Sequence, residues 1–262
     1  MDYISRKAKS NLIEKNTANF FLNLGYLNKD EIIDSPEIKY VLTKNWHSRI
    51  FMANFNESNA SENIELIVSK IKKLHISVLW YITPMSHPKN LKNLLMNHEF
   101  KYQNQWRSMA IDLKNVSKKF NIPKGIAIKE VFDLNQLKTW TDILVKSFEF
   151  PIVATSYKKY FCNLGVGNLN IQYYLGFLND KPVASAMIFK GEEAAGLFYI
   201  GTLHQARRRG IAQAMTCHLL NEAKKEGYNI CTVQASEMGY PLYKKIGFKQ
   251  YYITKIYAFN PI

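Results

Sequence analysis

Residues 202–212 read TLHQARRRGIA, the most informative stretch of the sequence. It lies between an apolar run that predicts a strand over 194–202 and a segment with helical spacing over 210–226. The first amides of a helix have no partners within the helix, and the helix dipole is positive there. Gly210 and Ala212 allow a phosphate to approach the backbone closely, and three arginines add positive charge. The stretch therefore predicts a diphosphate-binding loop.

Two familiar phosphate-binding classes are excluded by the glycine spacing. The sequence has neither GxxxxGKS/T nor GxGxxG, which argues against a nucleoside triphosphatase and a dinucleotide-binding dehydrogenase. The three cysteines, Cys162, Cys217 and Cys231, form no CxxC pair, and no histidine stands at a zinc-ligand spacing from them. We therefore expect no disulfide framework and no metal site.

The elements on either side of the loop can be read from apolar periodicity and turn residues. Three strands separated by the short turns 179–181 and 191–193 predict an antiparallel meander before the loop. Gly227 is suited to the left-handed cap that ends a helix. In chain order, the expected elements are a strand 126–131, helices 135–148 and 156–164, strands 171–178, 182–190 and 194–202, a helix 210–226, a strand 230–234, a helix 238–246 and one or two strands over 248–259.

The segment 207–212, RRRGIA, resembles the R/Q-x-x-G-x-G/A loop that holds the acyl-CoA pyrophosphate in GNAT-type N-acetyltransferases. The segment 242–248, LYKKIGF, is similar to the LYxxxGF element of the same family. The resemblance covers about residues 126–259. It implies an α/β (α+β) fold with a mixed, twisted sheet flanked by helices, splayed between its fourth and fifth strands to admit the CoA arm.

The resemblance also implies roles for individual residues, with acetyl-CoA as co-substrate. Tyr243 takes the position of the tyrosine that faces the thioester sulfur, and a phenol is suited to protonate a departing thiolate. Ser236 stands where many members have an asparagine that contacts the cofactor. The residues expected to bind the cofactor are Ile200 and Thr202 through their backbone, the loop Arg207, Arg208, Arg209, Gly210, Ile211, Ala212 and Gln213, and Ser236.

A carboxylate, a histidine or a water chain must accept the proton of the attacking amine, and Glu149 is one candidate for this general base. Glu149 follows the helix 135–148, in the region that borders the acceptor site in the family. Glu192 and Glu193 lie in a hairpin turn, where solvated surface charges are usual. An aromatic residue at helical spacing is also typical of a core, so Tyr243 could be a packing residue.

The first 120 residues give a weaker pattern. We expect helices over 11–27, 61–74 (behind a serine cap) and 90–97, strands over 50–55, 76–82 and 106–113, and a polar connector over 114–124. The order of the elements over 76–113 parallels that over 230–259, which suggests two tandem GNAT-like halves. We therefore divide the chain into a degenerate GNAT-like or accessory α/β domain (1–120) and an N-acetyltransferase domain (121–262).

Composition limits the partners. Of the net charge of +14, residues 1–120 carry +7 (18 basic, 11 acidic) and residues 121–262 carry +7 (17 basic, 10 acidic). Nucleic-acid binding normally concentrates basic residues on one element, so this even spread does not favour it. The sequence has no signal peptide and no apolar run of about 20 residues, so we expect a cytoplasmic protein without a membrane partner.

Three functions follow as hypotheses. The first is transfer of an acetyl group from acetyl-CoA to a primary amine by direct attack in a ternary complex. The alternative is a non-catalytic acyl-CoA sensor or scaffold, and the third is nucleic-acid binding through the positive charge. Small amines, antibiotics, amino acids, peptide N-termini and protein lysines all fit as acceptor, and no feature specifies an oligomeric state.

Overall fold

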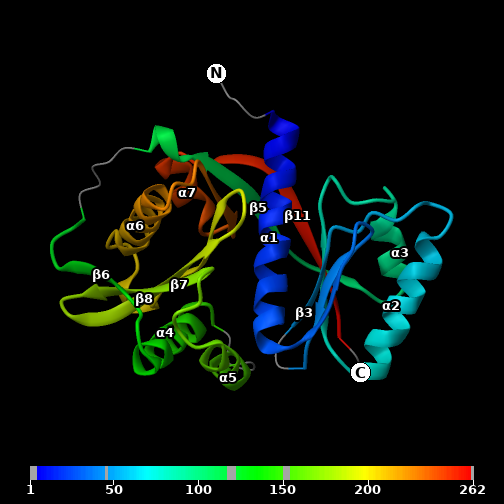
Figure 1. The fold of residues 1–262 in the computed structure, drawn as a ribbon, viewed down its shortest axis with the longest axis horizontal. Coiled ribbons are helices and arrows are strands. Elements are labelled where there is room, and N and C mark those ends of the chain that lie inside the picture. The colour runs from blue at the N-terminus through cyan, green and yellow to red at the C-terminus, as the bar shows by residue number, and fades with distance from the viewer. Residues whose placement is uncertain (1–4, 45–46, 117–121, 150–153, 261–262) are drawn as a thin grey trace. The chain divides into compact units, whose positions relative to one another are not determined.

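A computed structural model describes residues 5–44, 47–116, 122–149 and 154–260. The chain separates into two compact units, whose elements are labelled in Figure 1. The first unit comprises Met1–Ser108, Ala235–Glu237 and Tyr251–Ile262, and the second comprises Met109–Gln234 and Met238–Gln250. The division at residue 120 that the sequence suggests stays a prediction.

The first unit is a sheet with helices on both faces (Figure 1). The strands lie in the order β1-β2-β3-β4-β11, with β5 beside β11. Strand β3 is parallel to β4, whereas β1–β2, β2–β3 and β4–β11 are antiparallel. The elements are α1 (Arg6–Asn28), β1 (Glu31–Asp34), β2 (Lys39–Leu42), β3 (Ser48–Phe51), α2 (Ala60–Leu74), β4 (Val78–Ile82), α3 (Leu91–Asn97), β5 (Lys101–Asp112) and β11 (Lys249–Phe259).

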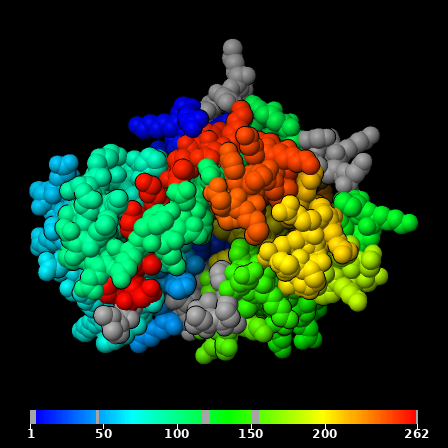
Figure 2. All heavy atoms as spheres, turned by 180° about the vertical axis from the view of Figure 1, so that it is seen from behind, coloured from blue at the N-terminus to red at the C-terminus, as the bar shows by residue number. Residues whose placement is uncertain are grey.

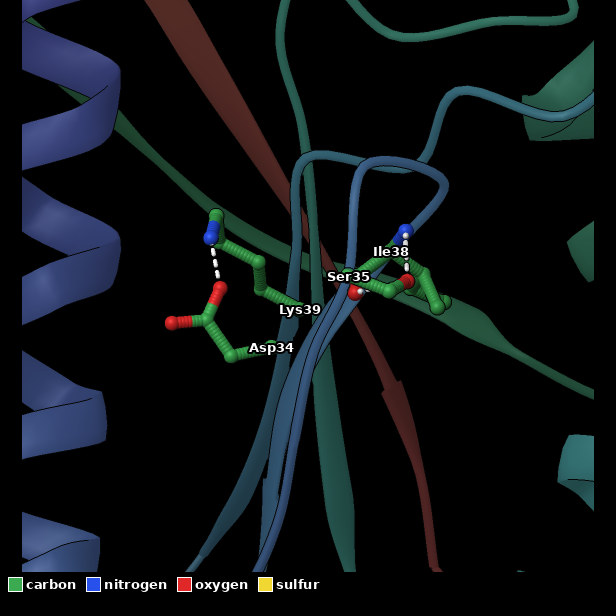
Figure 3. A network of polar contacts seen from close by, with 4 residues as sticks. All are labelled: Asp34, Ser35, Ile38 and Lys39. Atoms are coloured by element: carbon green, nitrogen blue, oxygen red, sulfur yellow. Dashed lines mark hydrogen bonds and ion pairs between the residues drawn. The ribbon is translucent and has the colours of Figure 1, made fainter.

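Polar contacts close the β1–β2 hairpin, which the sequence did not predict. The Ser35 hydroxyl donates to the Ile38 carbonyl (3.0 Å) and accepts from the Ile38 amide (3.2 Å). Lys39 and Asp34 form an ion pair across the same turn (Figure 3). Strand β1 has only exposed or half-buried residues, so it lacks the apolar alternation by which a strand is recognised.

The core of the first unit lies on both faces of its sheet. On one face, Phe21 of α1 stacks on Phe51 (ring centroids 5.3 Å apart). On the other face, Trp80 meets Phe100 at 5.7 Å, and the apolar stripe of α2 packs on the same cluster. The expected serine cap of α2 is wrong: the helix begins at Ala60 after Asn59, so Ser61 already lies inside the helix.

The second unit contains the predicted meander. Strands β6 to β9 are antiparallel in sequence order, β10 is parallel to β9, and β5 lies beside β10. Helices α4 and α5 cover one face and α6 the other (Figure 1). The elements are β6 (Ile126–Glu130), α4 (Leu134–Ser147), α5 (Ala154–Leu164), β7 (Ile171–Leu178), β8 (Lys181–Lys190), β9 (Ala195–Thr202), α6 (Ile211–Lys225), β10 (Ile230–Ala235) and α7 (Tyr240–Ile246).

The two units repeat one order of elements, which confirms the two similar halves expected from the sequence. The series β3-α2-β4-α3 of the first unit matches β9-α6-β10-α7 of the second, with parallel pairing of β3 to β4 and of β9 to β10. The helix ends also match. The Phe100 amide donates to the Leu95 carbonyl at 3.1 Å, as the Phe248 amide donates to the Tyr243 carbonyl at 3.0 Å.

In the described part of the chain, no helix combines the length and the apolar character that crossing a membrane requires.

Candidate active site

The C-terminal end of β9 extends beyond its pairing with β10. The parallel register of β9 with β10 runs from Ala195 to Leu197, and β9 continues beyond it to Thr202. A bulge against β8 falls in this extension, where Tyr199 takes a positive φ of 52° and its carbonyl accepts from the Ser185 hydroxyl (3.2 Å). The pairing with β10 therefore stops five residues before the end of β9, and the splay expected between the fourth and fifth strands stays a prediction.

The Thr202 hydroxyl is an orphaned polar atom at the end of this extension. Its oxygen is buried and has no hydrogen-bond partner among the described residues. A buried polar group without a partner is costly, so such a group often marks a place where a ligand or water binds. Together with the half-buried Ile200 on the same strand, Thr202 offers hydrogen-bonding groups at the end of β9.

The end of β9 packs closely against the end of α4 because Gly201 has no side chain. A Cβ atom added to Gly201 would lie 2.1 Å from the Ser147 Oγ and 2.8 Å from the Phe148 ring. Only glycine therefore fits at this crossing. The helix α4 itself begins at a strong cap, where the Asp133 carboxylate accepts from the Asn135 and Gln136 amides.

The arginine-rich loop forms a tight turn before α6. Arg208 and Gly210 both take positive φ, 62° and 78°, which reverses the chain immediately before the helix begins at Ile211. The side chains of Arg208 and Arg209 are exposed, and α6 begins with the backbone amides that a helix leaves unpaired. Ala212 and Gln213 are half-buried in its first turn. Exposed positive side chains next to the unpaired amides of a helix N-terminus favour the binding of a diphosphate.

Arg207 differs from the two arginines that follow it. Its Nε donates to the Thr202 carbonyl (3.1 Å) and its Nη2 donates to the Ser147 carbonyl (3.0 Å). The guanidinium thus joins the end of β9 to the end of α4. The exposed side chains of Arg208 and Arg209 remain available for the diphosphate that the sequence predicts. The Arg207 side chain is held by hydrogen bonds within the unit.

Tyr243 lies in α7 and is 7 % exposed. Its ring contacts Phe248 edge-on, with ring centroids 5.6 Å apart. Burial raises the pKa of the Tyr243 phenol well above its usual value near 10, so the hydroxyl keeps its proton at neutral pH. A neutral phenol is the form that a proton donor needs.

Glu149 and Ser236 lie at the surface. The Glu149 side chain is 76 % exposed, and its carboxylate lies 4.0 Å from the Arg207 guanidinium. The Glu149 backbone has a positive φ of 55°. Ser236 is exposed in the connection between β10 and α7, within the segment Ala235–Glu237 that belongs to the first unit. The base and cofactor roles assigned to them stay predictions.

The structure adds residues that the motif search passed over. Gly201 and Ser147 set the position of the β9 end, and Arg207 joins them. A glycine in a strand is a weak signal for close approach, but the partner of that approach is 54 positions away in sequence and belongs to no motif.

The first unit lacks the corresponding groups. By the matched helix-end hydrogen bonds, Leu95 occupies the position of Tyr243. The connection from β3 to α2, residues 52–59, contains no glycine and no arginine, and Glu57 and Glu62 lie near the start of α2. The features on which the predicted diphosphate binding rests therefore belong to the second unit.

Comparison with known proteins agrees with this geometry. The sequence model of the acetyltransferase (GNAT) domain matches residues 146–257. A GCN5-related N-acetyltransferase from Kribbella flavida is similar in structure, with a TM-score of 0.73, 14% identity and coverage of 94% of both chains. A tandem GNAT protein from the clavulanic acid biosynthesis pathway has a TM-score of 0.62 and 9% identity, with 85% of this chain and 78% of that chain covered. A search of the curated proteins finds no match.

Proposed function

We propose that the protein transfers an acetyl group from acetyl-CoA to a primary amine, because residues 146–257 match the sequence model of the GNAT acetyltransferase domain. The observation that carries the proposal is the loop before α6. There, two positive-φ residues and the exposed Arg208 and Arg209 precede a helix start, next in sequence to a strand end that extends beyond its pairing with β10.

The residues of the second unit fit acetyl-CoA as a substrate. The backbone of Arg208 to Gln213 and the side chains of Arg208 and Arg209 would hold the pyrophosphate. The end of β9, through the backbone of Ile200 and Thr202, would bind the amide groups of the pantetheine arm. Acetyl-CoA supplies an acyl group activated as a thioester.

Proton transfer then needs a donor and an acceptor. As the amine nitrogen bonds to the acetyl carbon and the carbon–sulfur bond breaks, Tyr243 gives its phenolic proton to the sulfur. The attacking amine must lose a proton, and Glu149 is the acceptor we propose, directly or through water. Its ion-pair partner Arg207 lies 4.0 Å away.

Tyr243→Phe tests the proton donor. We expect kcat, followed by thiol release, to fall about 100-fold or more, because a positioned acid contributes on that order. The KM for acetyl-CoA should stay close to that of the wild type. Since burial raises the pKa of the phenol, the wild-type rate should not fall on the alkaline side below pH 10.

Tyr26→Phe is the matched control, because Tyr26 is 58% exposed in the first unit and its hydroxyl has no role in the proposal. If Tyr243→Phe kept the wild-type kcat and pH profile, the assignment of Tyr243 as the acid would be wrong.

A binding-only domain is the second candidate function. The observation that favours it is that Glu149, the base we propose, lies at the surface with its side chain 76 % exposed. Binding of CoA without thiol release over a broad panel of amines would establish this second function in place of transfer.

A further inference from the structure

The first unit has a hollow that is unrelated to the loop before α6. It lies between α3 and the strands β5 and β11, and has a volume of about 520 Å³. Figure 2 shows the segment around α3 and the start of β5, in teal, beside β11, in red, on one face of the molecule. A volume of this size is within the range of small-molecule sites, roughly 300–1,000 Å³.

The charge of this hollow has one sign. Lys92 of α3, Lys101 of β5 and Lys255 of β11 all line it, and none of the described residues around it is acidic. All three lysines are exposed, and within the described ranges none of them forms an ion pair. The nearby Glu99 pairs with Lys72 of α2 instead (3.1 Å). Like charges that converge without a counter-ion favour an anion.

The apolar part of the hollow presents a flat ring. The Tyr102 ring meets the Tyr257 ring edge-on, with ring centroids 5.8 Å apart, and Tyr102 is 54 % exposed. Met96 of α3 is also half-exposed, at 52 %. An oriented aromatic face and a thioether beside it form a surface on which a planar ring can stack.

From this combination we propose that the hollow binds a small anion that carries a flat ring, such as a nucleoside monophosphate. The lysines contact the anionic group, and the ring lies on Tyr102 and Met96. Every residue that carries this inference belongs to the first unit, whereas the loop before α6 belongs to the second. The inference therefore does not depend on acetyl transfer.

The test follows the methyl group of Met96 by NMR on the full chain labelled at the methionine methyls, with Met96→Leu used to assign the signal among eight methionines. AMP is the probe. We expect a saturable shift of the Met96 signal, because a stacked ring changes the field at a neighbouring methyl. Inorganic phosphate should compete with AMP for the hollow. Benzoate, a flat ring that carries a carboxylate, is titrated in the same way, and its affinity compared with that of AMP shows which anion is preferred.

Variants separate this site from others. Lys255→Gln and Lys101→Gln should each weaken AMP about tenfold, the usual effect of losing one charged hydrogen bond. Tyr102→Leu should weaken AMP but leave phosphate unchanged. Lys73→Gln, which removes an exposed charge outside the hollow, and Arg209→Glu, which alters the loop before α6, should both bind AMP as the wild type does.

The proposal is overturned if the Met96 signal does not move in a saturable way with AMP, or if Lys255→Gln and Lys101→Gln bind AMP like the wild type. Loss of AMP binding in Arg209→Glu would assign the AMP to the loop before α6, which also overturns it. The outcome of the Tyr243→Phe experiment has no bearing on these results, so the two proposals fail separately.

Discussion

Arg207, Arg208 and Arg209 are identical in type and adjacent in sequence, yet the fold uses them differently. Arg207 points back into the unit and donates to the carbonyls of Thr202 and Ser147, and its side chain is only 25 % exposed. Arg208 and Arg209 are exposed at the turn before α6. Sequence alone assigns all three to the diphosphate, because a run of like residues has no internal signal for direction.

Arg207→Gln should therefore lower the free energy of unfolding. It removes two hydrogen bonds from a charged donor, and we expect unfolding to become easier by about 2 kcal/mol. Arg209→Gln should change stability by less than about 0.5 kcal/mol and weaken CoA binding instead. Urea unfolding and calorimetric CoA titration of both variants distinguish the roles. Equal stability of Arg207→Gln and the wild type would contradict this division of labour.

At the residue scale, the residues of the sequence motifs could be predicted, whereas the residues that matter through tertiary packing could not. The glycine and arginines of the loop and the place of Tyr243 follow from a motif. Gly201 and Ser147 matter because two elements cross there, and no local pattern reports a crossing between residues far apart in sequence.

Among the elements, β9 is the one whose position matters most for the proposed chemistry. It leaves the register of β10 after Leu197, bulges against β8 at Tyr199 and ends flush against α4 at Gly201. Each of these features moves the strand end relative to its neighbours. The strand thereby places the Thr202 groups and starts the loop that leads into α6.

Gly201→Ala tests how tightly this strand end is held. The added methyl would meet the Ser147 hydroxyl and the Phe148 ring, so the strand or the helix must shift, at an expected cost of about 2 kcal/mol in unfolding free energy. The KM for acetyl-CoA should rise as well.

Adding Ser147→Ala to Gly201→Ala removes the closest of these contacts and should restore part of the stability. A wild-type unfolding curve for Gly201→Ala alone would show that the crossing is not tight.

The element boundaries expected from the sequence are close where apolar spacing is regular. The strand 171–178 agrees with β7, and the helix 210–226 with α6 to within one residue at each end. Two elements begin earlier than expected because their first residues are mostly polar: β5 begins at Lys101, five residues before the expected start, and α1 begins at Arg6. The strand expected over 50–55 is wrong beyond Phe51, where β3 ends although Ala53 and Phe55 are buried.

At the scale of the whole molecule, each unit is completed by a strand from elsewhere in the chain. The C-terminal strand β11 pairs with β4 of the first unit over Lys255–Phe259. The end of β5, from Met109, belongs to the second unit, where the Leu113 amide donates to the Asn229 carbonyl at 2.8 Å. Periodicity predicts that these strands exist but carries no information on which strand pairs with which.

Fragments 1–120 and 121–262 should therefore not fold as separate domains. The first would expose the β4 edge that β11 covers, and the second would lose the β5 end, each a row of unpaired backbone groups. Circular dichroism and urea unfolding should show no cooperative transition for either fragment alone, with the intact chain as control. A cooperative transition in either fragment alone would contradict this expectation.

The central claim is that the loop before α6 binds acetyl-CoA, and calorimetric titration of the purified full chain with acetyl-CoA and CoA tests it most directly. The same titration is made on the chain carrying Arg209→Glu and Gly210→Asp, with its fold checked by circular dichroism. We predict saturable binding in the micromolar range for the wild type and loss of binding in the folded variant. No binding by the wild type, or equal binding by both proteins, would contradict the claim.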